Sequence, residues 1–392
     1  MIFPIWIERL PTLRGAVPPI ILGRVPYLVD NLWNHEDIMK FVQIISNAYG
    51  LPVSGADLRN DTIHEGLSHF GEVCQITPEM LLKSLKGGNL QGWLDTPPDL
   101  VVVEGVQLIE AAQRMRALFP STRFVFDFHN VESDLLRQQD IAKLPLILRP
   151  IAPLVFRNRW RKARELDLLV LGLAETVWVC SAQDRELVCR LCECLPRIAI
   201  VPNLAPNWCA KAKLQARVGG GPVLLFVGHL GYAPNKRAVR HLVRKVLPRL
   251  TSYHHHTRLI VAGRSPNARL QRMLGKNNHV ELIANPEEIS SVYAQADIVV
   301  VPLAEGGGSR IKILEALKVG CPIVATAKAV EGLGLIPERH FLQAENAADT
   351  ARAITRLFED ANLANRLIKE GHMHLEKNYT QEVVRREIHA SL

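Results

Sequence analysis

The stretch EGGGSRIKILEALKVGCPIVAT, residues 305–326, follows an apolar run at 298–301 and predicts a strand, a glycine-rich turn and a helix in succession. The helix is expected to begin near Ser309 and to stop at Gly320, because Pro322 behind it is a stop signal. Glycines at a strand-to-helix turn let the backbone approach a ligand, and the N–H groups and dipole of a helix start favour an anion. The stretch therefore predicts a phosphate-binding turn.

Three charged residues lie in this predicted helix. Arg310 and Lys312 place positive charge in the first turn, which the helix dipole disfavours unless an anion also binds there. Glu315 lies about one and a half turns from the helix start, among residues with core spacing. A carboxylate with apolar neighbours needs hydrogen-bond partners, and ribose hydroxyls are suitable ones.

Short apolar strands alternate with helical segments on both sides of this stretch. In the first half they are expected within residues 39–46, 71–76, 99–105, 123–130, 176–181 and 197–203, and in the second half within 223–235, 258–266, 279–288, 297–307 and 322–332. Such alternation implies parallel sheets covered on both faces, so the fold class is α/β. Two Rossmann-like units in tandem would bind ligands in a cleft at the carboxyl ends of their strands.

The chain of 392 residues is long enough for two domains. We expect an N-terminal domain at 39–203, a linker at 204–222, a C-terminal domain at 223–375 and a last helix at 376–392. Residues 1–38 contain five prolines and no sustained period, so we expect an extension with little structure and Met39 as the natural first residue. A lid or a membrane-contacting arm is the alternative.

Composition narrows the class of protein. Apolar residues make up 48% of the chain and no apolar run is long enough to span a membrane, which favours a soluble cytoplasmic protein. Seven cysteines without a scaffold spacing indicate reduced thiols. The net charge of +8 suits a polyanion, an anionic membrane or a phosphorylated ligand. Part of it lies at 157–164, RNRWRKAR, on a predicted amphipathic helix at 153–169 that is either a solvated face or a membrane-surface contact.

No metal site is expected. CRLCEC, residues 189–194, lies on a predicted helix and lacks a second pair at zinc spacing. HHH, residues 254–256, falls in a predicted loop between a helix and a strand, where surface exposure is the simpler explanation. The chain also lacks a Ser-His-Asp or Walker-type pattern, so a hydrolase or an NTPase has no residues to support it.

Residues 297–333, DIVVVPLAEGGGSRIKILEALKVGCPIVATAKAVEGL, resemble the signature of glycosyltransferase family 4, the "group 1" glycosyltransferases, in a Gly-rich Arg-x-Lys-Ile-Leu-Glu form. Four more stretches fit the family in order: GLPVSGADLRND at 50–61, DFHNVESD at 127–134, VPN at 201–203 and LLFVGHLGYAPNKRAV at 224–239. The resemblance covers about 39–375 and implies a GT-B fold, in which two Rossmann-like domains face a central cleft and the C-terminal helix crosses back to the first domain. Hinge closure around the donor would follow from that crossing.

The resemblance also implies a nucleotide-sugar donor bound mainly by the second domain, and transfer with retention that needs neither a metal nor a cofactor. Glu315 matches the family glutamate that holds the donor ribose, and Gly307, Gly308, Ser309 and Arg310 match the diphosphate region. The family's second glutamate, eight positions earlier, is replaced by Gly307, and Glu305 lies two residues too early to substitute for it. Either backbone N–H groups replace that carboxylate or sugar recognition differs.

A second departure concerns positive charge. Family members commonly carry an Arg directly after the first glycine of the second domain and a Lys soon after it, whereas Gly228 is followed here by His229, and Lys236 is displaced. Our hypothesis is that Arg310 and Lys312 supply the missing charge as catalytic groups, because cations beside a leaving diphosphate contribute most in the transition state.

Two residues of the first domain complete the candidate site. Gly55 matches the family's glycine loop near the donor phosphates, although it is also an ordinary turn glycine in type. His129 resembles a site residue near the transferred sugar, where it would accept a proton or bond a hydroxyl; a structural histidine is the alternative. Asp127 and Glu132 flank it, and Asp127 would orient the imidazole or be the acidic group itself.

The leading interpretation is a retaining glycosyltransferase of hexosyltransferase type, which moves a sugar from a UDP- or GDP-type donor to a glycan or a lipid-linked glycan in polysaccharide or glycoconjugate biosynthesis. The expected partners are the nucleotide-sugar donor, that acceptor and an anionic membrane contacted peripherally at its cytoplasmic face, with no nucleic acid. A sugar-nucleotide epimerase on the same fold and a non-catalytic or regulatory GT-B binding protein are the alternatives.

Overall fold

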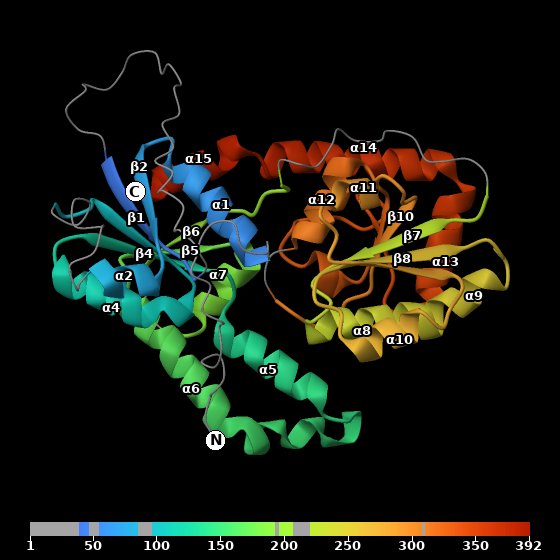
Figure 1. The fold of residues 1–392 in the computed structure, drawn as a ribbon, viewed down its shortest axis with the longest axis horizontal. Helices are drawn as coiled ribbons and strands as arrows, with labels where there is room; N and C mark the ends of the chain where they lie inside the picture. The colour runs from blue at the N-terminus through green and yellow to red at the C-terminus, as the bar shows by residue number, and fades with distance from the viewer. Residues whose placement is uncertain (1–38, 47–54, 85–95, 193–195, 207–219, 308–309) are drawn as a thin grey trace, which may run out of the picture. The chain divides into compact units, whose positions relative to one another are not determined.

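The computed structural model describes residues 39–46, 55–84, 96–192, 196–206, 220–307 and 310–392. The expected N-terminal extension, 1–38, and most of the expected linker therefore lie outside the described residues. Two six-stranded parallel sheets organise the described chain (Figure 1).

The first sheet has the strand order β2-β1-β3-β4-β5-β6. Its strands are β1 Met39–Ile44, β2 Gly71–Ile76, β3 Leu100–Glu104, β4 Arg123–Phe128, β5 Thr176–Val179 and β6 Arg197–Ile200. The central strands are buried on both faces because helices cover both sides, and this explains the apolar runs LVVV in β3 and FVF in β4.

The second sheet has the order β12-β11-β10-β7-β8-β9. Its strands are β7 Val223–Val227, β8 Arg258–Gly263, β9 Val280–Ala284, β10 Ile298–Val301, β11 Ile323–Ala325 and β12 Leu342–Gln343. Both sheets follow the doubly wound pattern, in which the strand order reverses near the middle and leaves a crevice at the carboxyl ends.

The helices of the first half are α1 Gly55–Leu67, α2 Pro78–Ser84, η1 Val106–Leu108, α4 Ile109–Leu118, α5 Glu132–Lys143, η2 Leu146–Ile151, α6 Ala152–Leu173 and α7 Ala182–Cys189. Those of the second half are α8 Ala233–His241, η3 Leu242–Val246, α9 Leu247–Thr251, α10 Ala268–Leu274, α11 Ser290–Tyr293, α12 Ile311–Val319, η4 Ala327–Val330, α13 Ala347–Glu359, α14 Ala361–Asn378 and α15 Gln381–Ser391. None of the described helices is both long and apolar enough to cross a membrane.

The last helix returns to the first sheet. Gly66 of α1 lies so close to α15 that a Cβ there would stand 2.5 Å from Ile388 Cδ1. Trp178 of β5 donates its indole N–H to Ser391 Oγ at 2.9 Å. Figure 1 shows the result, with α14 beside α12 in the second half and α15 beside α1 in the first.

Three sequence expectations need correction. The pattern of residues 58–70, LRNDTIHEGLSHF, predicts a helix after a loop, but α1 begins earlier, at Gly55, and ends at Leu67. The helix expected near Ser309 begins at Ile311, with Arg310 at its N-cap. The CRLCEC stretch is not helical throughout, because α7 ends at Cys189 and residues 193–195 lie outside the described chain. Cys74, Cys180 and Cys189 are free thiols.

Candidate functional site

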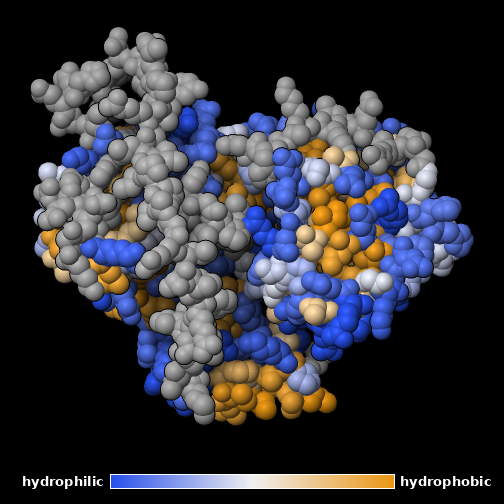
Figure 2. Space-filling view, viewed as in Figure 1, coloured by the Kyte–Doolittle hydropathy of each residue, from blue (hydrophilic) through white to orange (hydrophobic). Residues whose placement is uncertain are grey.

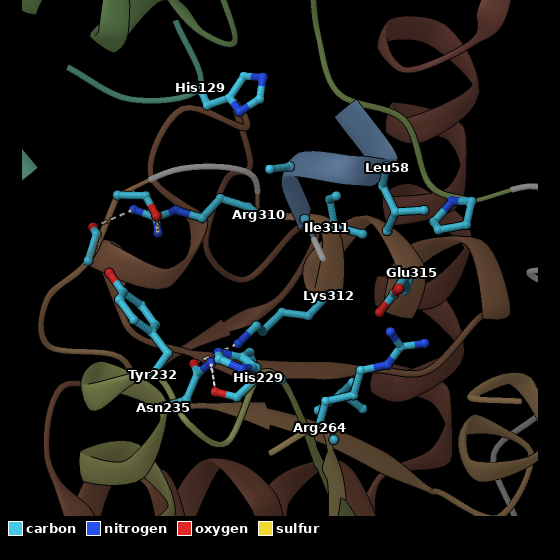
Figure 3. Close-up of a pocket in the computed structure, with 18 of the residues that line it drawn as sticks. Leu58, His129, His229, Tyr232, Asn235, Arg264, Arg310, Ile311, Lys312 and Glu315 are labelled. Carbon is cyan, nitrogen blue, oxygen red and sulfur yellow. Dashed lines mark hydrogen bonds between the residues drawn. The ribbon is translucent and has the colours of Figure 1, made fainter. Parts of the chain in front are cut away.

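A pocket of about 1350 Å³ lies between the loops at the carboxyl ends of both sheets (Figure 3). The second sheet contributes the residues that follow β7, β8 and β10 and the first turns of α12, and the first sheet contributes the residues that follow β3 and β4 and the start of α1. Its size suits a nucleotide with an attached sugar. Gly55 and Gly228, which the family resemblance implies as donor-site glycines, both line the pocket.

Glu315 lies in α12 and faces this pocket. Its carboxylate is 6% exposed and accepts a hydrogen bond from Tyr293 Oη at 2.7 Å. Burial raises the pKa of Glu315 to about 7, against the opposing effects of Tyr293 and Lys312. A buried carboxylate that accepts this one hydrogen bond retains lone pairs, so it can also accept hydrogen bonds from ligand hydroxyls.

Lys312 lies one turn before Glu315 in α12. Its ammonium donates to Asn235 Oδ1 at 2.9 Å and lies 5.0 Å above the ring of Phe226. Burial lowers the pKa of Lys312 to about 8. A Cβ on Gly228 would stand 2.8 Å from Lys312 Nζ, so the glycine at the end of β7 is what allows the ammonium to approach the backbone there.

Arg310 holds the glycine-rich turn in place through its guanidinium. The guanidinium donates to the carbonyl oxygens of Gly306 at 3.2 Å and Gly307 at 3.4 Å, and pairs with Glu331 at 3.3 Å. Burial lowers its pKa, against the charge of Glu331. Arg310 lines the pocket, but these contacts also give it a structural role that the sequence did not predict.

The glycine that replaces the family glutamate touches the first domain. A Cβ at Gly307 would stand 2.7 Å from Asn130 Oδ1, in the loop after β4. Glu305 is 9% exposed and pairs with Arg237 of α8. A larger side chain at position 307 would therefore have to displace Asn130. Gly308 and Ser309, two further predicted donor-site residues, lie outside the described residues.

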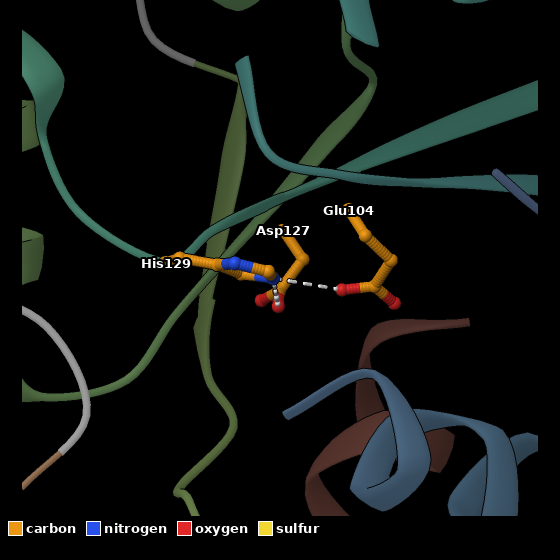
Figure 4. A group of neighbouring side chains, drawn as sticks. All are labelled: Glu104, Asp127 and His129. Carbon is orange, nitrogen blue, oxygen red and sulfur yellow. Dashed lines mark hydrogen bonds and ion pairs between the residues drawn. The ribbon is translucent and has the colours of Figure 1, made fainter. Parts of the chain in front are cut away.

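His129 follows β4 and belongs to a buried network with Glu104 and Asp127 (Figure 4). The register of the sheet pairs Glu104 at the end of β3 with Asp127 of β4, so adjacent strands bring the two carboxylates together. His129 Nε2 lies 3.1 Å from Glu104 Oε2 and 3.4 Å from Asp127 Oδ2. Figure 4 shows the imidazole directed at both carboxylates.

Arg59 of α1 completes the network from the other side. Its guanidinium forms two hydrogen bonds to Asp127, at 2.8 and 2.7 Å, and a third to the Val201 carbonyl at 2.6 Å. Burial opposes charge on Asp127, yet the charge and hydrogen bonds of Arg59 outweigh it and hold the pKa of Asp127 well below its usual range. The sequence placed Asp127 beside His129 but gave no role to Arg59 or Glu104.

The same network sets the charge of His129. Burial alone would lower the pKa of His129, but its bonds to Asp127 and Glu104, and their charges, raise it to about 9. Burial, and next the charge of Asp127, raise the pKa of Glu104 to about 7. Near neutral pH the imidazole is therefore a cation and a hydrogen-bond donor. Of the two roles expected from the sequence, this favours bonding a hydroxyl over accepting a proton.

Glu104, Asp127 and His129 also have donor atoms within 4.8 Å of one another, a spacing at which a metal ion can bind. Here the atoms already satisfy each other, because Arg59 engages both oxygens of Asp127 and His129 engages Glu104. The chemistry of the set is that of an ion-pair network around His129. Glu132, the other flanking acid, lines the pocket, and burial raises its pKa.

Three polar residues of the second domain, Tyr232, Asn235 and Arg264, also line the pocket, although the sequence did not predict them. Arg264 follows the last residue of β8, and its buried Nη1 has no hydrogen-bond partner among the described residues. Figure 3 shows Arg264 on the same side of the pocket as Glu315, while Arg310 and Tyr232 lie on the other side. Asn235 holds Lys312. Arg264 could have been identified from its position just after a predicted strand. Tyr232 and Asn235 lie at the start of α8, where the sequence carries no comparable signal.

Comparison with known proteins agrees with this architecture. Residues 221–360 match the family model described as Glycosyl transferases group 1. Among curated proteins, a sequence search finds no match.

Solved structures extend the likeness to almost the whole chain. The sucrose-phosphate synthase of Thermosynechococcus elongatus superposes with a TM-score of 0.64 at 16% identity, over 90% of this chain and 98% of the other. A UDP-forming α,α-trehalose-phosphate synthase of Burkholderia xenovorans gives 0.61 at 13% identity, over 91% and 98%. HepE of Anabaena, solved in complex with UDP and glucose, gives 0.60 at 12% identity, over 90% and 98%. The chain thus has the GT-B fold, and its second domain carries the sequence features of the group 1 glycosyl transferases.

Proposed function

We propose that the protein is a retaining glycosyltransferase that moves a sugar from a nucleotide-sugar donor to a glycan or lipid-linked glycan. One observation carries the proposal: a single pocket joins the carboxylate of Glu315 and the ammonium of Lys312 in the second domain to the imidazole of His129 in the first. That HepE was crystallised with UDP and with glucose supports a UDP-type donor.

Each group has a role in this proposal. Glu315 accepts hydrogen bonds from the ribose hydroxyls. Lys312 and Arg310 stabilise the diphosphate, which gains negative charge as the bond from its oxygen to the anomeric carbon breaks. His129 donates to a hydroxyl of the sugar being moved. The acceptor oxygen forms the new bond to the anomeric carbon, and its proton passes to the diphosphate oxygen that leaves. Since side-chain cations supply the charge, the proposed reaction needs no metal and no cofactor.

The proposed acceptor is a growing glycan, and its lipid-linked form suits the net charge of +8. The protein would then work in the cytoplasm, at the inner face of the membrane.

Calorimetry of UDP and GDP binding tests the donor site. We expect one nucleotide to bind wild type, and Glu315→Ala to weaken it about 10-fold or more, the size of a lost charged hydrogen bond. Glu281→Ala, which removes an exposed carboxylate of β9, is the matched control and should change nothing. If neither nucleotide binds, or if Glu315→Ala has no effect, the donor site is wrong.

Turnover tests the chemistry separately. Release of the nucleotide in the presence of a suitable acceptor should fall at least about 100-fold in Lys312→Ala, because cations at a leaving diphosphate act mainly in the transition state. Nucleotide binding without turnover would favour a non-catalytic GT-B protein, and a changed sugar nucleotide as the product would favour an epimerase. Unchanged turnover in both Arg310→Ala and Lys312→Ala would remove these residues from the catalytic set.

A further inference from the structure

The hairpin formed by α5, η2 and α6 carries five large apolar side chains at its tip that face solvent. They are Ile147 at 87% exposure, Leu154 at 80%, Val155 at 58%, Ile151 at 44% and Leu148 at 42%. Figure 2 shows an apolar area at the lower edge of the molecule, where Figure 1 places this tip. A contiguous exposed group of this kind marks an interaction surface.

Positive charge surrounds the apolar tip. Residues 141–164 contain Lys143, Arg149, Arg157, Arg159, Arg161, Lys162 and Arg164, and no Asp or Glu. Lys143 and Arg159 pair with the buried carboxylate of Asp140, whereas Arg149, Arg157 and Lys162 are exposed. The hairpin therefore presents apolar side chains at its end and cations beside and behind them.

Asp140 holds the two helices of the hairpin together beneath this surface. Its buried carboxylate accepts hydrogen bonds from Lys143 at 2.7 Å, Arg159 Nη1 at 2.9 Å and the Trp160 indole at 3.2 Å. These bonds join the end of α5 to α6, so the exposed side chains keep one orientation relative to the helices that carry them.

We propose that this tip inserts into the interfacial layer of a bilayer that contains anionic lipid. The apolar side chains would enter the boundary between headgroups and acyl chains, and the arginines would contact the phosphates above it. A second copy of this chain is the less suitable occupant, because a symmetric contact would bring two copies of the same acid-free, strongly basic segment together.

Helix α5 links this surface to the pocket. It begins at Glu132, a pocket-lining residue, and ends at Lys143, so its 12 residues span about 18 Å. Membrane binding at the tip would hold the pocket within about the length of a glycan headgroup from the lipid surface. This delivery of a lipid-linked acceptor rests on the proposed function, whereas the membrane contact itself does not.

Co-sedimentation of the full chain with vesicles tests the contact. We expect binding to phosphatidylcholine vesicles that contain a third of phosphatidylglycerol, and little binding to pure phosphatidylcholine. Ile147→Asp/Leu154→Asp and Arg157→Glu/Lys162→Glu should each weaken partitioning about 10-fold or more. Leu154→Phe, which keeps an apolar side chain, should retain it.

Matched controls in the second domain separate this surface from net charge and general exposure. Tyr253→Asp removes a large side chain that is 82% exposed, and Arg244→Glu/Lys245→Glu changes the net charge as much as the tip variant does. Both should bind vesicles like wild type. The thermal midpoint of every variant checks the fold. UDP titration of wild type tests the proposed function separately, and its failure would leave the vesicle result standing.

Two results would overturn the proposal. One is equal vesicle binding by wild type and both tip variants. The other is a dimer of wild type in sedimentation velocity that Ile147→Asp/Leu154→Asp converts to a monomer while vesicle binding is absent, which would assign the tip to a second copy.

Discussion

At the scale of single residues, the pocket holds an acid and a base whose charges burial has weakened. The pKa of Glu315 is raised to about 7 and that of Lys312 is lowered to about 8, in each case chiefly by burial. Near neutral pH neither group is fully charged. A nucleotide diphosphate that bonds its ribose to Glu315 and its phosphates beside Lys312 would favour the charged form of both, so binding and proton transfer should be coupled.

This coupling predicts protons moving in opposite directions at two pH values. At pH 7 about half of Glu315 is protonated, so UDP binding should release protons. At pH 8 about half of Lys312 is deprotonated, so binding should take protons up. Calorimetry of UDP in buffers of different ionisation enthalpy measures both.

Two variants separate the contributions. Glu315→Gln should abolish the release at pH 7, and Lys312→Met should abolish the uptake at pH 8, while Glu281→Gln should leave both unchanged. A binding enthalpy that is independent of the buffer at both pH values would contradict this account of the two groups.

The Glu104 carboxylate predicts a pH dependence of turnover. His129 donates as a cation, so activity should fall as the pH rises through its pKa of about 9. Glu104→Gln keeps a hydrogen-bonding side chain but removes the charge that stabilises the imidazolium. We therefore expect the alkaline limb of the kcat/KM profile to move down by about one pH unit or more.

The matched control is Glu72→Gln, an exposed carboxylate of β2. An unchanged alkaline limb in Glu104→Gln would show that His129 does not carry the titration. If only the maximal rate fell, with no shift in the limb, Glu104 would be a structural group and would not set the protonation of His129.

At the scale of elements, the sequence pattern predicted the bounds that neighbouring residues determine. β2 has the bounds that its apolar run indicated, and α12 stops at Gly320 because only a residue that tolerates φ 75° closes the helix there. Glu315 was indicated by its place among core residues of a predicted helix and His129 by the family resemblance, and both line the pocket.

What the sequence did not reveal depends on pairs far apart in the chain. Arg59 and Asp127 are 68 residues apart and meet only because α1 packs beside the end of β4. Glu104 joins them through the register of β3 and β4. The start of α12 was placed too early because glycine and serine fit either a turn or a first helical turn, so the local pattern does not separate the two.

Gly320 also gives a prediction about stability. Gly320→Ala forces a Cβ into the left-handed region and should lower stability by about 1 kcal/mol, seen as a lower thermal midpoint. Gly172→Ala is the matched control: it lies in α6, and an added Cβ would meet nothing within 4 Å, so stability should stay equal or rise slightly. Equal midpoints for wild type and Gly320→Ala would contradict the C-cap role.

At the scale of the whole molecule, the C-terminal helices connect the two sheets. α14 packs against α12, which carries Glu315 and Lys312, and α15 packs against α1, which carries Arg59. Gly371 of α14 allows that contact, since a Cβ there would stand 2.6 Å from Leu317 Cδ2. α14 and α15 therefore each pack against a helix that contributes residues to the pocket.

Ile388 predicts how the connection contributes. Ile388 of α15 is fully buried against Gly66 of α1. Ile388→Val should lower the free energy of unfolding by about 1 kcal/mol and Ile388→Ala by about 2–5 kcal/mol, and the thermal midpoint should fall in that order. Met373→Ala, at an exposed position of α14, should leave the midpoint unchanged.

The Kd of UDP and the turnover rate together distinguish two roles of α15, one in stability alone and one in closure of the first domain. The groups expected to hold the nucleotide lie mainly in the second domain, whereas Ile388 packs on the first. Ile388→Ala should therefore leave the Kd of UDP within about two-fold of wild type. Turnover should fall, because α15 would support closure of the first domain over the donor. If the Kd rose as steeply as the stability fell, the nucleotide would depend on both domains before any closure. If turnover stayed at the wild-type level in a protein destabilised by Ile388→Ala, α15 would be a structural clasp with no part in the catalytic cycle.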